Sequence, residues 1–297
     1  MIEITEKGFL TLPVCSERHA LAGFGVPRGG PMDPVRCLLA NRLAGNPDTA
    51  GALEATLGLP GIRFTDERAF AVVGGAEEMT LLRGGEKLAV KPGETLTALP
   101  GDELLPCPLA RGMRAYIAVS GGIRTELRPR SVKKGDMLSL GEGGKAPLRR
   151  IVREVLPLPG DEAVLRVIPG VQRDHFSAEG AESFYSEEYT YTPLSDRMGI
   201  RLSGAAVGFA DGHDGNIISE GMLPGDIQIT SAGQPILMTA DCPTAGGYAK
   251  IAHLISADMP LAAQLRPGAR LRFRQVEVAD AHIALRRLML ALGGCIR

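Results

Sequence analysis

The amino-acid sequence predicts a mainly β protein with a few helices, and two observations carry that prediction. The 297 residues include 38 glycines and 21 prolines but no tryptophan, a balance typical of many short strands joined by tight turns. A Pro-Gly or Lys-Gly turn followed by a short, largely apolar run also recurs along the chain. Glycine supplies the positive φ that such turns need, so we interpret each repeat as the start of a strand. The repeats stand at Pro60-Gly61, Pro92-Gly93, Pro100-Gly101, Lys134-Gly135, Pro224-Gly225 and Pro267-Gly268.

Because these turns recur in both halves, the sequence predicts two β domains, each a barrel or a sandwich. The length of 297 residues fits two domains at roughly 150 residues each, or one large β-rich unit. The polar run Gly141-Glu142-Gly143-Gly144 leads into the proline-punctuated VLPLPG, a composition typical of a domain boundary. We therefore predict an N-terminal domain of residues 1–155 and a C-terminal domain of residues 156–297.

Helical patterns are few. Residues 34–44 form an amphipathic pattern that begins with Pro34, a residue suited to a first helical turn, and stops before Gly45. Val278–Leu292 repeats apolar residues at helical spacing, and a short helix is expected near Leu261–Leu265. Strands are expected at Ala69–Val73, Met113–Val119, Ala163–Ile168, Ile200–Ser203 and Leu271–Val276.

The composition argues against several kinds of partner. Basic side chains number 33 and acidic ones 34, so the net charge of −1 gives no attraction to nucleic acid or to an anionic membrane. No apolar stretch approaches the roughly 20 residues of a membrane span, and the opening MIEITEKGF lacks a signal-peptide pattern. We expect a soluble, cytoplasmic protein. Its five cysteines are scattered, which is typical of reduced thiols rather than of a disulfide framework.

Common catalytic signatures are missing from the sequence. It has no P-loop, GxSxG or HExxH motif, and its five histidines stand alone, so we expect no metal site built on histidine. The acidic loop DGHDGN around His213 leaves two interpretations open, a metal-binding loop or a solvated turn.

The stretch Ser219–Tyr248 is the richest in candidate residues. Ile227–Thr230 alternates apolar and polar residues and Pro235–Met238 is apolar, so the two form a predicted hairpin. Carboxylates at strand ends accept protons or hold metals, and paired glycines expose backbone amides to an oxyanion or phosphate, although a Gly-Gly pair is also a common turn. The candidates are Glu220, Gln228, Asp241, Thr244, Gly246, Gly247 and Tyr248.

Two other segments supply candidates. Asp196 and Arg197 place an acid and a guanidinium at the start of a predicted strand, where the arginine binds a carboxylate or phosphate, or pairs with an aspartate to tether a loop. The glycine-rich loop GVPRGGPMD runs into a helix, and helix N-termini bind anions, which makes Gly30 and Asp33 candidates. Asp33 itself also complements the helix dipole.

Seven motifs, in a fixed order, resemble one known family. They are GVPRGGPMD, ANRLAGNP, LEATLGLPGIRF, SDRMGIRLSG, SEGMLPGDIQI, GQPILMTADCPTAGGY and AQLRPGARLRF. Together they span nearly the whole chain and resemble the allophanate hydrolase subunit 2 family, also described as biotin-dependent carboxyltransferase-like proteins. That family includes the C-type subunit of the bacterial 5-oxoprolinase and the antagonist of the Kip-type sensor-kinase inhibitor. The resemblance implies two cyclophilin-like β-barrel domains, a partner resembling allophanate hydrolase subunit 1, and often a third subunit of the lactam-utilisation type.

Two segments depart from the family's pattern. Val14-Cys15-Ser16-Glu17-Arg18 stands where the family usually has Gln-Asp-x-Gly-Arg, and RTELRPRSVKKGD after Ile123 is shorter than usual. Both departures favour a divergent branch.

The resemblance implies three alternative functions. In the first, the chain is a hydrolase subunit, active only with its partners, of an ATP-dependent complex that opens 5-oxoproline to glutamate. ATP, with or without Mg²⁺, would be bound by this chain or by a partner. Activating the lactam oxygen by phosphorylation needs charged contacts, so we assign catalytic roles to Asp196, Arg197, Glu220 and Asp241, and substrate or ATP contacts to the remaining candidates. The second function is carboxyl transfer from carboxybiotin to urea or a related amide. The third is a non-enzymatic regulator that binds a kinase-inhibitor partner.

Overall fold

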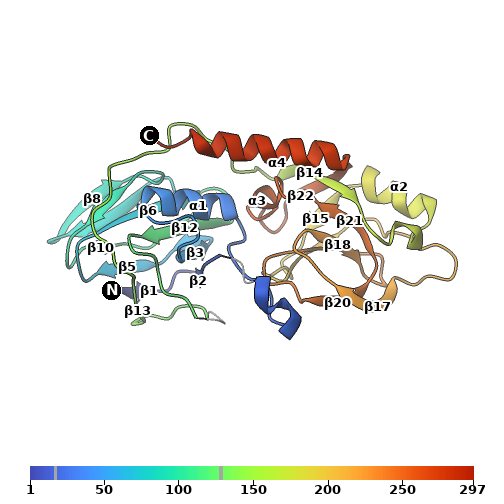
Figure 1. Ribbon diagram of the computed structural model, residues 1–297, viewed down its shortest axis with the longest axis horizontal. Helices are drawn as coiled ribbons and strands as arrows, with labels where there is room; N and C mark the ends of the chain where they lie inside the picture. Colours follow the sequence, from blue (N-terminus) through green and yellow to red (C-terminus); the bar gives the residue numbers. More distant parts are fainter. Residues whose placement is uncertain (17–18, 127–129) are drawn as a thin grey trace. The chain divides into compact units, whose positions relative to one another are not determined.

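Figure 1 shows the computed structural model of the chain, which describes residues 1–16, 19–126 and 130–297. The described chain is mainly β, as the sequence predicts. Glu17, Arg18 and residues 127–129 lie outside the described residues, and with them lie parts of the two segments that depart from the family's pattern.

The chain divides into two compact units. Unit 1 contains Met1–Ser16, Asp33–Leu158 and Ala291–Arg297. Unit 2 contains the segment that ends at Met32 together with Pro159–Leu290.

Two sheets of unit 1 enclose a single core. One sheet has the order β13-β1-β5-β10-β7-β8 and the other β2-β3-β12-β6-β9, while β4 and β11 form a separate ladder. Ile4 and Phe64 from the first sheet and Leu53 and Ile117 from the second are fully buried in one apolar cluster. The strands are β1 Ile2–Glu6, β2 Leu10–Val14, β3 Ala52–Thr56, β4 Gly58–Leu59, β5 Gly61–Phe64, β6 Arg68–Gly74, β7 Met79–Arg83, β8 Glu86–Val90, β9 Leu96–Ala98, β10 Glu103–Leu104, β11 Cys107–Pro108, β12 Arg114–Val119 and β13 Met137–Leu138.

The helix α1 (Pro34–Leu43) contacts β12 and β6, whose residues are nearly all buried because the sheet is covered on both faces. Its buried residues include the polar Arg36 and Asn41, so α1 is more deeply buried than the predicted amphipathic helix of residues 34–44. Hydrogen bonds make this possible: Arg36 donates to the Leu156 carbonyl at 2.7 Å, and Asn41 donates to the Ala50 carbonyl at 2.9 Å.

Unit 2 is built around a closed barrel with the order β14-β21-β18-β19-β16-β15-β22 (Figure 1). Strand β14 pairs antiparallel with β21 and parallel with β22, which closes the barrel. Outside the barrel, β17 and β20 form a two-stranded sheet. The strands are β14 Glu162–Pro169, β15 Tyr189–Tyr191, β16 Gly199–Ser203, β17 Asn216–Gly221, β18 Asp226–Ile229, β19 Pro235–Met238, β20 Ala245–Tyr248, β21 Lys250–Leu254 and β22 Arg270–Gln275.

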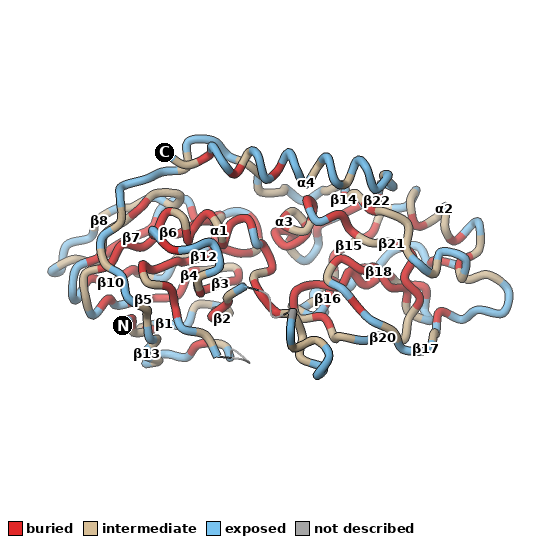
Figure 2. Tube along the Cα trace, viewed as in Figure 1, coloured by how far each residue is buried: buried red, intermediate tan, exposed pale blue. Residues whose placement is uncertain are grey.

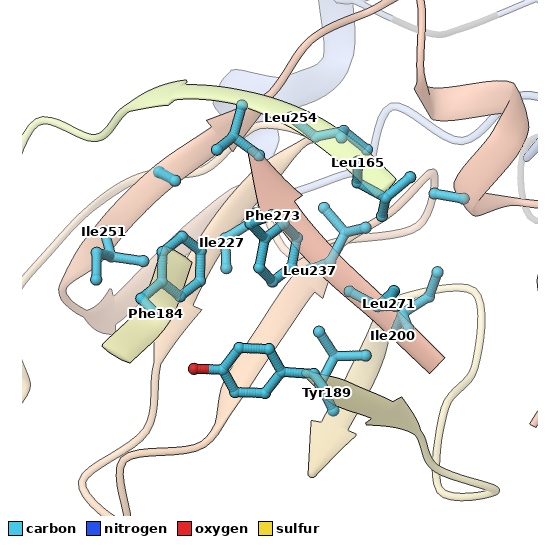
Figure 3. Packing of buried hydrophobic residues seen from close by; sticks show 14 of the residues in the cluster. Leu165, Phe184, Tyr189, Ile200, Ile227, Leu237, Ile251, Leu254, Leu271 and Phe273 are labelled. Carbon is cyan, nitrogen blue, oxygen red and sulfur yellow. The ribbon is translucent and has the colours of Figure 1, made fainter. Parts of the chain in front are cut away.

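The core of unit 2 is an apolar cluster that fills the barrel (Figure 3). Phe184 of the helix α2 (Ala178–Ser186) stacks on Phe273 of β22 with ring centroids 4.6 Å apart. The helical patterns found in the sequence do not include α2. The side chain of Ser177 caps this helix by accepting the Gly180 N–H at 3.0 Å.

All six predicted turns precede or begin a strand, namely β5, β9, β10, β13, β18 and β22. Gly225 and Gly268 have φ values of +102° and +92°, the left-handed region that glycine adopts readily. The predicted hairpin is also confirmed, because β18 and β19 pair antiparallel with Ile227 opposite Leu237.

Two predicted helices appear as α3 (Met259–Ala262) and α4 (Val278–Gly293). Most of α4 is exposed, whereas Leu288 and Leu292 are buried (Figure 2). Two 3-10 turns, at His19–Phe24 and Arg173–His175, complete the described elements. Across the described residues, every helix is too short or too polar to cross a lipid bilayer.

Candidate functional site

Two strand pairings in unit 2 bring four residues together. In the β17–β20 sheet, Glu220 lies opposite Gly246. In the barrel, Gln228 of β18 lies opposite Lys250 of β21. Glu220 forms an ion pair with Lys250, and Gly246 approaches Gln228, so the two pairs close into one group. Gln172 joins this group because it donates to Glu220 and accepts the Lys250 backbone N–H. We call Gln172, Glu220, Gln228 and Lys250 the lysine cluster.

Gly246 lies in a strand rather than in the Gly-Gly turn that the sequence allows, and packing explains why this position is glycine. A Cβ atom added at Gly246 would lie 1.9 Å from the Met222 Cε atom and 3.4 Å from the Gln228 Oε1 atom. Real Cβ atoms do not approach another heavy atom as closely as 1.9 Å. The bare backbone therefore lets β20 lie directly against Met222 and Gln228.

Lys250 is held by three partners. Its ammonium group donates to Glu220 Oε1 and, at 3.1 Å, to the Gly221 carbonyl. Its backbone N–H donates to Gln172 Oε1 at 3.1 Å, while Gln172 Nε2 donates to the same Glu220 oxygen. The Lys250 side chain is only 8% exposed, whereas that of Glu220 is 42% exposed. The carboxylate thus stands at the solvent side and the ammonium lies inside.

The charge state of this pair follows from its contacts. The hydrogen bond from Lys250, and next the one from Gln172, lower the pKa of the Glu220 carboxyl below its ordinary value. Glu220 is therefore a carboxylate at neutral pH, and its negative charge balances the positive charge of the Lys250 ammonium group.

Gln228 is the incompletely bonded member of the lysine cluster. The residue is only 8% exposed, and its Oε1 atom has no hydrogen-bond partner among the residues that the structure describes. Buried polar groups are nearly always hydrogen-bonded, so this acceptor beside a buried lysine is a candidate contact for a water molecule or a ligand.

A second polar group in unit 2 joins three of the predicted site residues. Arg197 donates to both Asp241 oxygens, at 2.8 and 3.0 Å, and to the Gly30 carbonyl at 2.7 Å. The Arg197 carbonyl in turn accepts the Asp241 N–H at 2.8 Å and the Thr239 hydroxyl at 2.7 Å. This bidentate pair connects three loops, which matches the tethering role that the sequence leaves open.

The other predicted residues lie apart from these contacts or have a local role. Asp196 is exposed and accepts the N–H groups of Met198 and Gly199, so it shapes its own turn. Thr244 accepts the Met222 N–H through its carbonyl. Gly247 and Tyr248 are half-buried residues of β20.

Asp33 belongs to unit 1 and is fully buried there. Its carboxylate caps α1 by accepting the Arg36 N–H at 3.0 Å, and it pairs with the Arg36 guanidinium at 2.6 Å. The Asp33 carboxylate therefore complements the dipole at the N-terminus of α1 itself. Of the two roles that the sequence allows, this is the one other than binding an external anion.

Unit 1 contains a cavity of about 380 Å³ lined by α1, the end of β6 and the segment that follows residue 150. Aliphatic and charged side chains both line it, and Arg36 and Arg111 are among the charged ones. None of the predicted site residues lines this cavity. Among the described residues, no three His, Cys, Asp or Glu side chains are grouped so that they could hold a metal ion.

Sequence reasoning did not identify Lys250 or Gln172. A signal for Lys250 does exist, because it is the charged residue in the otherwise apolar run AKIAHLI, and lysine is rarely buried unless it is paired. Gln172 lies outside the regular strands and carries no such signal.

Residues 24–275 match the family described as carboxyltransferase domain, subdomain A and B. The chain belongs to this family. This confirms the resemblance that the motifs indicate. Among carboxyltransferase-domain relatives, the C-type subunit of 5-oxoprolinase from Escherichia coli (strain K12) is 31% identical over 296 residues, which cover 95% of the chain and 93% of that protein. The urea amidolyase of Saccharomyces cerevisiae is 30% identical, over 84% of the chain but only 15% of that protein.

Solved structures agree with this family membership. The urea amidolyase of Kluyveromyces lactis superposes with a TM-score of 0.86 and 26% identity, covering 98% of the chain and 20% of that protein's chain. The carboxyltransferase-domain chain thus corresponds to one part of the long urea amidolyases and to nearly all of the C-type 5-oxoprolinase subunit.

Proposed function

We propose that this chain is the C-type subunit of a 5-oxoprolinase complex, which opens 5-oxoproline to glutamate using ATP. The observation that carries the proposal is the likeness to the E. coli C-type subunit, which is 31% identical over 95% of this chain and 93% of that protein. The expected partners are a protein resembling allophanate hydrolase subunit 1 and a third subunit of the lactam-utilisation type.

The lysine cluster supports an amide as the substrate. A lactam carbonyl is unreactive because resonance spreads its electrons over nitrogen and oxygen, so catalysis needs charge placed near that oxygen. Lys250 supplies an ammonium that is buried and therefore strong in its electrostatic effect. Glu220 and Gln172 hold it in position.

Two of the candidate site residues already have partners within the chain. Arg197 is already bonded to both oxygens of Asp241 and to the Gly30 carbonyl, and Gly246 is paired within a strand. We therefore assign ATP, with any Mg²⁺ that accompanies it, to a partner subunit.

Reconstitution tests the proposal. The purified chain mixed with its two partner subunits should release glutamate and ADP from 5-oxoproline, and omission of this chain should abolish the release. No turnover in the complete mixture contradicts the proposal.

One observation favours a second candidate, carboxyl transfer from carboxybiotin to urea or a related amide. The chain superposes on the K. lactis urea amidolyase over 98% of its length with a TM-score of 0.86. Biotin would then be carried by another polypeptide. Supplying a carboxybiotin-loaded carrier with urea should yield a carboxylated amide under this alternative, and unchanged product formation counts against it.

A further inference from the structure

The two buried side chains of the lysine cluster present complementary hydrogen-bonding groups. Gln228 and Lys250 lie opposite each other on neighbouring strands, and both residues are more than nine-tenths buried. Gln228 Oε1 is an acceptor without a partner among the described residues. A ligand that donates one N–H to this oxygen would satisfy it.

Lys250 adds a donor beside this acceptor. An ammonium group has three N–H donors, and those directed at Glu220 and the Gly221 carbonyl account for two of them. The third is suited to a carbonyl oxygen. Because Glu220 keeps the ammonium compensated, this donor bonds a neutral carbonyl without needing a charged ligand.

The surroundings limit the ligand's size and add an apolar wall. Gly246 places no side chain in front of Gln228, and the flexible end of Met222 fills that place, since its Cε atom lies 1.9 Å from where a Gly246 Cβ would stand. A ligand must therefore displace the end of the Met222 side chain. Met222 belongs to a small buried apolar cluster with Ile236, Met238 and Cys242. A small ring with one N–H, one C=O and a short hydrocarbon part matches all three features.

We infer that Gln228 and Lys250 recognise the two ends of a secondary amide, with the amide N–H donating to Gln228 Oε1 and the amide oxygen accepting from Lys250 Nζ. Gln228 is then the residue that selects a lactam over a lactone, because the ring oxygen of a lactone cannot donate. The inference rests on the proposed function for the identity of the lactam, 5-oxoproline, but not for the selection of an N–H.

Binding of two matched probes tests this selection. Calorimetry on the complex with its partner subunits compares 5-oxoproline with its lactone analogue, 5-oxotetrahydrofuran-2-carboxylate, which has the same ring and carboxylate but no N–H. The complex containing the natural chain should bind the lactam at least about tenfold more tightly, since the lactone leaves a buried acceptor unpaired. Gln228→Met, which has nearly the same length but no amide, should reduce this preference to about twofold or less.

A matched control separates selection from general damage. Gln234 lies in the same barrel and bonds the backbone of Gly204 through both ends of its amide. Gln234→Met should keep the full preference for the lactam. Thermal unfolding of both variants checks that each is folded.

The binding experiment and the turnover experiment can fail independently, so the inference and the proposed function are tested separately. Equal affinity for lactam and lactone in the natural complex, or an unchanged preference in Gln228→Met, overturns the inference even when 5-oxoproline is turned over. A Gln228-dependent preference without any turnover supports the inference and contradicts the proposed function.

Discussion

Each unit of this protein has a buried polar group, and the two groups differ in how far their carboxylates are exposed to solvent. In unit 1, Asp33 pairs with Arg36 at 2.6 Å and Glu54 lies 3.6 Å from Arg114. The Tyr116 hydroxyl joins the pairs, since it accepts the Asp33 N–H and donates to Glu54, both at 2.7 Å. We call these five residues the tyrosine network.

The lysine cluster of unit 2 is built differently. Its carboxylate, Glu220, is 42% exposed, and its buried amide, Gln228, has an acceptor without a partner among the described residues. The tyrosine network pairs opposite charges inside unit 1 and connects α1 to the sheet, whereas the carboxylate of the lysine cluster faces solvent. Burial and polarity alone therefore do not distinguish the two groups; the exposed carboxylate of the lysine cluster does.

The electrostatics of the tyrosine network agree with a structural role. Burial, and next the charge of Glu54, raise the pKa of the Tyr116 hydroxyl well above its ordinary value, so this hydroxyl remains a donor at any physiological pH. Burial likewise raises the pKa of the Cys37 thiol of α1, which keeps it protonated and unreactive.

The largest expected effect is on stability in unit 1. Asp33→Ala removes the cap of α1 and leaves the buried Arg36 without its carboxylate, so the free energy of unfolding should fall by about 3–5 kcal/mol in urea denaturation. The control is Glu67→Ala, which breaks an exposed ion pair with Lys145 and should cost less than about 1 kcal/mol. Similar losses for both variants would mean that the network is not what holds α1.

Gly246→Ala should have an intermediate effect. The new methyl group must displace Met222 Cε, the flexible end of its side chain, so we expect a loss of about 1–3 kcal/mol in unfolding free energy. The methyl group also enters the space in front of Gln228, and binding of 5-oxoproline should weaken. As a comparison, alanine at Gly84 meets no atom within 4 Å, although its φ of +55° adds strain of its own. Weakened binding in Gly84→Ala as well would contradict a local effect.

Lys250→Met should change stability little, in contrast to Asp33→Ala. Methionine fills a similar apolar volume, and the remaining carboxylate of Glu220 is partly solvated and still bonded to Gln172. We expect the unfolding free energy to change by less than about 1 kcal/mol. A loss as large as that of Asp33→Ala would show that the lysine cluster is also structural.

The smallest effect concerns pH. Because the folded pKa of Glu220 is depressed, the ion pair with Lys250 is complete above the ordinary glutamate value of 4.5 and is lost only as pH falls through the lower folded pKa. NMR titration of the Glu220 carboxyl should therefore give a midpoint below 4.5 in the natural chain. In Lys250→Met the midpoint should move upward. An unchanged midpoint would show that Lys250 is not the cause.

Local patterns predicted much of the fold. The Pro-Gly and Lys-Gly turns located six strands, and the period-two pattern at Ile227–Thr230 indicated the β18–β19 hairpin. Glu220, Gln228 and Gly246 could be selected because they stand close together in the chain at strand ends. Neither α2 nor the pairing of β20 with β17 was predicted; α2 buries only Gly180 and Phe184, which form no extended apolar repeat.

What could not be predicted depends on contacts between distant segments. Lys250 lies opposite Gln228 because a register shift between Ile227 and Gln228 sets the pairing of β18 with β21, and no single stretch of sequence encodes that shift. Gln172, which donates a hydrogen bond to Glu220, stands in a loop 48 residues earlier in the chain. Arg197 meets Asp241 and Gly30 in the same way, across 44 and 167 residues.

Turnover by the reconstituted complex is the most direct test of the claim that the lysine cluster is the functional site. Complexes containing the natural chain or Lys250→Met are compared for glutamate release from 5-oxoproline, with thermal unfolding confirming that both chains are folded. We predict that Lys250→Met lowers turnover by about 10- to 100-fold, the loss expected for one charge-assisted hydrogen bond to the substrate. Equal turnover by the two complexes would contradict a functional role for the lysine cluster.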